Sequence, residues 1–297
     1  MTSLIPSARC IPRITPSRLR EHLATPSPRP LHLPGLIAAW PALSQWRLSD
    51  QLREIRNAVG EERAVEVELG RKGRGYLDPD WQRVNLGFGI FLDAFIFNMI
   101  PSSAPKSQLP SAYLAQSDLL DSCPQLAEAV PLLPHFYQGS EKSLYRRTVW
   151  IGPDKSFTPF HKDPYVGIYS QGECQAVQLY ANVAVQGNKI FHVLPPESAQ
   201  HLSPSGLARH TNTSQIPLPV SRIFPRANSV FPNDDGLGDL PMNIINTCRS
   251  QLEKAFAMDG ACEVYLKEGE SVLIPEGWWH AAEGGDGPGV GVGAWFR

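Results

Sequence analysis

The chain has 297 residues, 42% of them apolar, and it carries 27 lysines and arginines against 29 aspartates and glutamates. This length and apolar content suit one large domain or two small ones with a buried core, and the near balance of charge does not indicate a nucleic-acid partner. The five cysteines are scattered without a CxxC pair, which argues against a zinc module and fits a reducing compartment. No apolar run approaches the roughly 20 residues that a membrane-spanning helix needs, so no membrane partner is expected.

Residues 1–33 are expected to be an N-terminal tail that contains a short helix. The tail has four arginines before its first acidic residue, Glu21, and mitochondrial targeting peptides share this composition. Thr15-Pro16-Ser17 is, however, a typical helix start, and Leu19 and Leu23 follow it at helical spacing. We favour the helix over a targeting role and expect the protein in the cytoplasm, the nucleus or both.

Residues 34–140 are predicted to form a mainly helical flank. Leu52, Ile55 and Val59 are spaced three and four apart, which predicts a helix that ends at Gly60. Alternating apolar and charged residues predict a strand at 64–70, and glycines with basic residues predict a loop at 71–81. Two more helices are predicted, at 89–100 and 112–130.

Residues 141–297 are predicted to be rich in strands. Runs of strand-forming residues bounded by turn signals lie at 145–151, 189–194, 270–274 and 289–296. An insert at about 200–262 is rich in proline, serine and asparagine, and it contains one helix candidate at 244–256. Such a long stretch inside a compact domain is either functional or mobile.

Two stretches far apart in the chain carry candidate metal ligands. His161 and Asp163 are two residues apart, so in an extended segment both side chains leave the same face. A third candidate, His280, follows the predicted strand at 270–274. Two imidazoles and one carboxylate on one side of an ion leave the opposite positions open, as in the non-haem Fe(II) oxygenases. The alternative is a core histidine with an Asp-Pro turn, and the sequence around the ligands favours the metal site.

The remaining histidines and the tryptophans beside His280 are not needed as ligands. His192, His201 and His210 are expected at the surface. Trp278 and Trp279 are expected to pack against the core and to fix the strand that carries His280.

With these motifs the sequence resembles the JmjC-type (cupin-8) family of Fe(II)- and 2-oxoglutarate-dependent oxygenases. The resemblance runs from Pro34 to the C-terminus, and WIGPDKSFTPFHKDP and LKEGESVLIPEGWWHA carry it around the ligands. Within the family the sequence is most similar to the arginyl-hydroxylase branch known as JmjC-domain protein 5, and to fungal proteins described only as JmjC-domain or cupin-like. The resemblance implies a β-rich α+β fold: a double-stranded β-helix, or cupin-like jelly-roll, with an α-helical N-terminal flank. One domain would then span residues 34–297, with the jelly-roll core at 141–297.

The resemblance also implies cofactors and their binding residues. Fe(II) would be held by His161, Asp163 and His280, with 2-oxoglutarate as cosubstrate and dioxygen as oxidant. Lys189 lies on a predicted strand that ends in Leu-Pro-Pro, where the family places the lysine that pairs with the distal carboxylate of 2-oxoglutarate. Thr158 and Tyr113 match family positions whose hydroxyl groups help to bind that carboxylate.

Two features depart from the family. Lys189 follows His161 by 28 residues, about twice the family spacing, and removal of Gly172–Ala184 would restore the pattern. We predict that this insert protrudes as a loop or hairpin, because a sheet tolerates added length at a turn better than within a paired strand. Gly167 stands where the arginyl-hydroxylase branch has an asparagine that hydrogen-bonds the cosubstrate.

The resemblance finally implies a substrate site in the flank and the core. The arginyl-hydroxylase branch surrounds a substrate arginine with acidic and aromatic residues at positions that match Glu68, Tyr76, Trp81, Trp150 and Trp295. A carboxylate can accept the guanidinium fork while aromatic faces stack on its plane, although aromatic residues also simply pack in cores.

The favoured function is therefore hydroxylation of a protein or peptide side chain, with arginine as the preferred target. The alternatives are demethylation of an N-methyl group, hydroxylation of a small molecule or tRNA base, and an inactive, cupin-like interaction protein. The sequence leaves the oligomeric state open.

Overall fold

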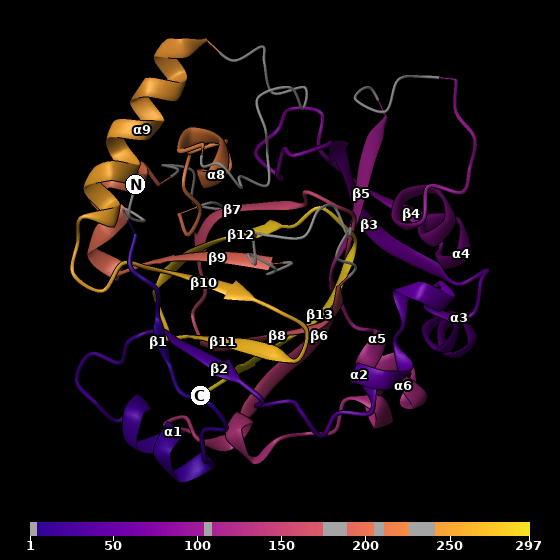
Figure 1. Ribbon diagram of the computed structural model, residues 1–297, viewed down its shortest axis with the longest axis horizontal. Coiled ribbons are helices and arrows are strands. Elements are labelled where there is room, and N and C mark those ends of the chain that lie inside the picture. The colour runs from indigo at the N-terminus through magenta and orange to yellow at the C-terminus, as the bar shows by residue number, and fades with distance from the viewer. Residues whose placement is uncertain (1–4, 104–108, 175–188, 205–210, 226–240) are drawn as a thin grey trace, which may run out of the picture.

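Two β-sheets face each other in the computed structural model, which describes residues 5–103, 109–174, 189–204, 211–225 and 241–297 (Figure 1). The larger sheet contains, in spatial order, β1 (Arg9–Cys10), β2 (Leu31–Pro34), β11 (Glu270–Ile274), β8 (Val166–Cys174), β13 (Gly289–Phe296), β6 (Leu144–Gly152), β5 (Pro110–Ser117), β3 (Ala64–Arg71) and β4 (Gln82–Gly87). The smaller sheet contains β10 (Cys262–Leu266), β9 (Lys189–Leu194), β12 (Trp279–Gly284) and β7 (Phe157–Lys162). Antiparallel pairing of strands from distant parts of the chain gives the jelly-roll that the family resemblance implied.

Short helices cover the outer faces of both sheets (Figure 1). The larger sheet packs against the N-terminal segment and against α1 (Pro16–Leu23), α2 (Ala42–Gln45), α3 (Arg53–Val59), α4 (Phe88–Phe91), α5 (Leu119–Ser122) and α6 (Pro124–Ala129). The smaller sheet packs against α7 (Ala199–Leu202), α8 (Val220–Ile223) and α9 (Met242–Phe256). Among the described residues, no helix is both long enough and apolar enough to cross a membrane.

The N-terminal segment is built into the larger sheet. The predicted helix is confirmed as α1, which starts where the Thr15 side chain accepts the backbone N–H of Arg18. After α1 the chain enters β2, which pairs with β11, and Leu31 and Leu33 are fully buried. Residue 33, the expected end of the tail, therefore lies inside a paired strand.

Several local predictions are confirmed and one is wrong. The strands at 64–70, 145–151, 270–274 and 289–296 and the helix at 244–256 are present as β3, β6, β11, β13 and α9. The predicted helix at 112–130 is instead β5 followed by α5 and α6. Leucine, alanine and glutamine favour a helix locally, but β5 fills the place between β3 and β6, where Tyr113 lies opposite Glu68 and Leu114 opposite Ile151.

The two inserts are described only in part. Gly172–Cys174 continue β8, and Cys174 lies opposite Gly289 of β13. The rest of Gly172–Ala184 is outside the described residues, so its protrusion stays a prediction. The second insert supplies α7, α8 and α9, which form an apolar core with the outer face of the smaller sheet.

The expected surface position of His192 is wrong. Its side chain is on the outer face of β9, and α8 and α9 cover that face. Its imidazole lies between two buried carboxylates, with Nδ1 3.1 Å from Glu263 Oε1 and Nε2 3.2 Å from Glu283 Oε1. His201 is half-buried, and His210 is outside the described residues. Trp278 and Trp279 are buried, as predicted.

Candidate active site

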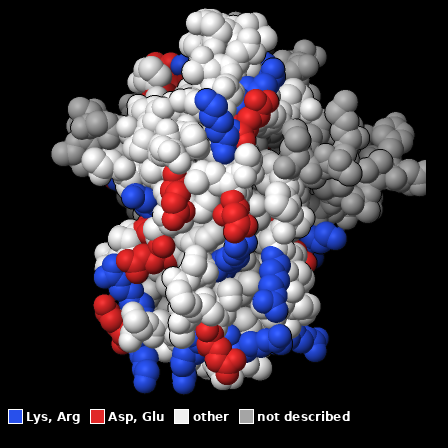
Figure 2. Space-filling model, turned by 90° about the vertical axis from the view of Figure 1, so that its left-hand side faces the viewer, with Lys and Arg blue, Asp and Glu red and all other residues white. Residues whose placement is uncertain are grey.

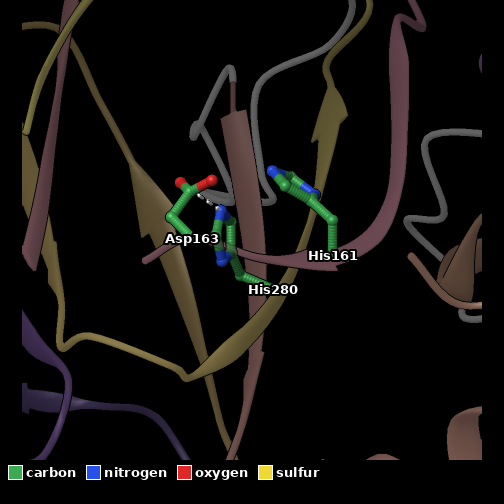
Figure 3. Close-up of side chains that lie close together, drawn as sticks. All are labelled: His161, Asp163 and His280. Atoms are coloured by element: carbon green, nitrogen blue, oxygen red, sulfur yellow. Dashed lines mark ion pairs between the residues drawn. The ribbon is translucent and has the colours of Figure 1, made fainter. Parts of the chain in front are cut away.

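Three candidate metal ligands meet between the two sheets. One donor atom from each of His161, Asp163 and His280 lies within 4.8 Å of the other two, and the three side chains approach one another in Figure 3. Among the described residues, this is the one cluster of three or more such side chains. Two imidazoles and one carboxylate suit Fe(II) and leave coordination positions open.

The pairing of β7 with β12 brings the ligands together, because His161 lies opposite His280 in the register. Asp163 directly follows β7, and its carbonyl oxygen accepts the backbone N–H of Gly277 at 3.1 Å. Gly277 has a φ of 79°, which glycine adopts without strain, so the chain can turn tightly just before β12. The two ligand segments are thereby tied to each other through the backbone.

Backbone carbonyls orient both imidazole rings. His161 Nδ1 lies 2.9 Å from the carbonyl oxygen of Pro159, and His280 Nδ1 lies 3.3 Å from that of Trp278. These contacts assign the proton of each ring to Nδ1, so Nε2 of each ring remains as the metal donor.

The protonation states also suit a metal. Burial and the neighbouring His161 lower the pKa of His280 to about 4, against the opposing effect of Asp163. Burial alone would raise the pKa of Asp163, but His161, His280 and a hydrogen bond from Trp295 hold it below its usual value. Neutral imidazole and ionised carboxylate are the forms that coordinate a metal ion.

Trp295 is placed against a metal ligand. Its Nε1–H donates to Asp163 Oδ2 at 2.8 Å, so the indole fixes the orientation of the carboxylate. Hydrogen bonds of this kind to a ligand are known to tune a metal site. The sequence predicted Trp295 only as an aromatic wall for substrate.

Lys189 lies in the same pocket, and its ammonium group is buried. Its Nζ donates to Tyr113 Oη at 2.9 Å, and burial lowers the pKa of Lys189 to about 8. In the part of the chain that the structure describes, no carboxylate forms an ion pair with this lysine. A buried cation is costly unless an anion joins it, so the residues present fit the distal carboxylate of 2-oxoglutarate.

Side chains from both sheets line this pocket. From the larger sheet it is lined by Tyr113, Trp150, Gly167, Tyr169 and Trp295, and from the smaller sheet by Thr158, Lys189, Phe191 and Ala282, beside the three ligands. The three residues predicted to bind the cosubstrate, Tyr113, Thr158 and Lys189, therefore share one cavity with the metal ligands. The buried Nε1 of Trp150 has no hydrogen-bond partner among the described residues.

The five residues predicted to bind substrate separate into two groups. Trp150 and Trp295 line the pocket, whereas Glu68, Tyr76 and Trp81 are not among its lining residues. Glu68 lies opposite Tyr113 in the strand register, and the Tyr76 ring contacts that of Trp81. Burial raises the pKa of Glu68, with Arg83 and Trp81 opposing. The pKa of Tyr76 is raised to about 12, chiefly by burial; a hydrogen bond to Thr213 opposes this, and the charges of Glu68 and Asp163 contribute to it.

Thr213 lies beside the ligand His161, a position that the sequence did not indicate. The N–H of Lys162 donates to Asn212 O at 3.0 Å and that of Ser214 to Phe160 O at 2.8 Å, so this segment of the second insert runs along β7 beside His161. The segment carries no strand pattern, so only the folded chain places it next to a ligand. Tyr165 stacks on Tyr145, with ring centroids 4.3 Å apart, and lines the pocket. The sequence analysis missed it, although it is only two residues from Asp163.

Comparisons with known proteins agree with this geometry. A model of the family described as "Cupin-like domain" matches residues 16–297. The chain is 26% identical to lysine-specific demethylase JMJ30 of Arabidopsis thaliana over 251 residues, which are 84% of this chain and 46% of that protein. It is 25% identical to lysine-specific demethylase 8 of Xenopus tropicalis over 287 residues, 94% of this chain and 51% of that protein. It is also 30% identical to HSPB1-associated protein 1 of Mus musculus over 150 residues, 50% of this chain and 23% of that protein. The chain thus spans about half the length of the curated demethylases that it matches.

Proposed function

Because this chain belongs to the cupin-like domain family of JmjC-type Fe(II)- and 2-oxoglutarate-dependent dioxygenases, we propose that it oxidises an aliphatic carbon on a cationic side chain of a protein. The observation that carries the proposal is one pocket that holds two histidines, one aspartate and a buried lysine. The first three residues suit Fe(II), and the lysine suits the far end of a dicarboxylate. Neither feature alone would separate an oxygenase from another metal-binding cupin.

When bound, iron and 2-oxoglutarate would supply the activation of dioxygen, and the protein would supply orientation and exclusion of water. The backbone contacts at Nδ1 of His161 and His280 present Nε2 of both rings to the ion. Trp295 holds the Asp163 carboxylate, and Lys189 with Tyr113 offers a donor pair to the distal carboxylate. The aromatic lining of the pocket would keep water from the reacting centre.

The choice of a cationic side chain rests on Glu68 and its aromatic neighbours. Glu68 is on the strand next to Tyr113, and Tyr76 and Trp81 lie beside it. A carboxylate in low-dielectric surroundings attracts a cation strongly, and aromatic faces add to this attraction. Two relatives are named lysine-specific demethylases, so N-methyl-lysine is the first candidate substrate. Arginine hydroxylation is the second, because the Glu68 carboxylate could accept a guanidinium fork.

The proposal is tested with the purified chain, Fe(II), 2-oxoglutarate and peptides that carry either methylated lysine or arginine. Succinate should form, and mass spectrometry should detect loss of a methyl group from lysine or gain of one oxygen on arginine. Asp163→Ala should abolish both signals, whereas Asp259→Ala, which alters an exposed carboxylate, should not. Equal succinate release by the parent and Asp163→Ala would refute the proposed metal site. Substrate-independent succinate release with no peptide oxidised would refute the protein substrate.

A further inference from the structure

The ammonium group of Lys189 lies between two tyrosine rings. Its Nζ is 5.2 Å from the ring centroid of Tyr113 and 5.3 Å from that of Tyr169. The 2.9 Å hydrogen bond to Tyr113 Oη places Nζ near the edge of the Tyr113 ring. The separation from Tyr169 is within the range of a cation–π interaction. Tyr113 was predicted for cosubstrate binding, whereas no motif of the sequence indicates Tyr169.

Two glycines allow these rings to reach the lysine. The strand order β8-β13-β6-β5 places Tyr169 and Tyr113 on strands separated by β13 and β6, and each ring leans over a glycine of the strand beside it. A Cβ atom on Gly291 would be 1.9 Å from Tyr169 Oη, and one on Gly152 would be 2.8 Å from Tyr113 Cε2. Any larger residue at Gly291 would displace the Tyr169 ring, and any larger residue at Gly152 would displace the Tyr113 ring.

Further contacts hold Tyr169 in place. Its hydroxyl donates to Gln171 Oε1 at 3.3 Å, and Gln171 Nε2 donates to the carbonyl oxygen of Val290 at 3.1 Å. Its ring also packs on Phe191, with centroids 5.0 Å apart. Gly167, two residues earlier on the same face of β8, has no side chain that could contact a cosubstrate. Tyr169, two residues further along β8, lines the pocket with its ring.

A buried ammonium group has lost its hydration, and an aromatic face partly replaces it. We propose that Tyr169 is a further cosubstrate-positioning residue, whose ring keeps the charged ammonium group of Lys189 directed at the distal carboxylate of 2-oxoglutarate. This inference rests on the proposed function, since it assumes that 2-oxoglutarate binds in this pocket. It goes beyond that function because Tyr169, which orients Lys189, is not one of the residues that the sequence predicted to bind the cosubstrate.

The first test measures 2-oxoglutarate binding by isothermal titration calorimetry to protein loaded with Mn(II), which avoids turnover. Tyr169→Leu removes the ring and should weaken 2-oxoglutarate binding by about 5- to 30-fold, with Mn(II) affinity unchanged. Tyr169→Phe keeps the ring and should remain within about threefold of the parent. Tyr137→Leu, the same change on a side chain outside the pocket, should bind as the parent does.

A second variant keeps the test decisive if Tyr169→Leu does not fold. Gly291→Ala leaves Tyr169 in the sequence but displaces its ring, so it should weaken 2-oxoglutarate binding to a similar extent. If both changes act through the Tyr169 ring, the variant that combines Tyr169→Leu with Gly291→Ala should bind 2-oxoglutarate no more weakly than Tyr169→Leu alone.

The pH dependence of binding separates a role at Lys189 from general damage to the fold. The titratable groups around this lysine in the described structure are the phenols of Tyr113 and Tyr169, and His161, Asp163 and His280 line the same pocket. Loss of the Tyr169 ring disfavours the charged lysine, so the fall in 2-oxoglutarate binding with rising pH should begin at lower pH in Tyr169→Leu.

The outcomes distinguish the two proposals. If the parent protein does not bind 2-oxoglutarate, the proposed function fails. If the parent binds it, and Tyr169→Leu or Gly291→Ala binds it equally tightly with the same pH profile, only the role of Tyr169 is refuted.

Discussion

Replacing His192 with asparagine should remove a loss of stability that the parent protein shows between pH 7 and pH 9.5. His192 lies on the outer face of the smaller sheet, between the carboxylates of Glu263 and Glu283. The three side chains are at most 4% exposed. Burial disfavours the imidazolium, but the two carboxylates outweigh this effect and raise the pKa of His192 to about 9.

The size of the effect follows from this shift. The folded-state pKa is raised above the ordinary value of 6.5, so the stabilisation is fully present below pH 6.5 and is lost as the pH rises through about 9. At 1.36 kcal/mol for each pKa unit, the full contribution is about 3 kcal/mol, of which about 2 kcal/mol disappears between pH 7 and pH 9.5.

The measurement is urea unfolding of the parent and of His192→Asn across this pH range. Other groups with shifted pKa values, such as Lys189 and Cys262, are present in both proteins, so subtracting the two curves removes their contribution. His22→Asn, which changes a histidine outside the cluster, should follow the parent curve. Parallel stability curves for the parent and His192→Asn would show that His192 is not held as an imidazolium.

Three more predictions concern the pocket. Lys189→Ala should raise the KM for 2-oxoglutarate at least about 10-fold and leave iron affinity near normal, because only the distal carboxylate of 2-oxoglutarate loses its partner. An unchanged KM would place this lysine outside the cosubstrate site. Trp295→Phe removes the donor to Asp163 and should weaken Fe(II) binding by about 10- to 100-fold, as measured by competition with a chelator; unchanged affinity would assign the indole to packing alone. His280→Ala should abolish both iron retention and 2-oxoglutarate turnover, and turnover at the parent rate would contradict the triad.

The metal site was predictable from the sequence because its chemistry depends on residue type and local spacing. A strand places residues two apart on one face, so the spacing of His161 and Asp163 predicts that both side chains can reach the same ion. Local patterns were similarly sufficient for α1, with its Thr15 cap, and for the alternating strands β3 and β13. The His161–Asp163 pair, α1 and the two strands are each encoded within a few neighbouring residues, whereas His280 joins the pair only when β12 pairs with β7.

Local patterns failed where a residue's surroundings come from distant parts of the chain. Tyr113 lies in a run of good helix formers, yet it is in β5 because β3 and β6 supply hydrogen-bonding partners on both sides. Side chains in β9 alternate between the two faces of the sheet, and His192 is on the outer face. It is nevertheless buried, because α8 and α9 cover that face.

The sequence by itself indicated which residues could bind a metal, and its resemblance to the JmjC-type family indicated which could bind a dicarboxylate. The tertiary structure alone decided what surrounds them: the Trp295 bond to Asp163, the insert segment beside His161, and the Tyr169 ring against Lys189. The space for that ring depends on Gly291, which is 122 residues from Tyr169 in the chain and becomes its neighbour only when β13 pairs with β8. Contacts of this kind arise from the register of long-range strand pairs, and a one-residue shift of that register would turn each side chain to the opposite face.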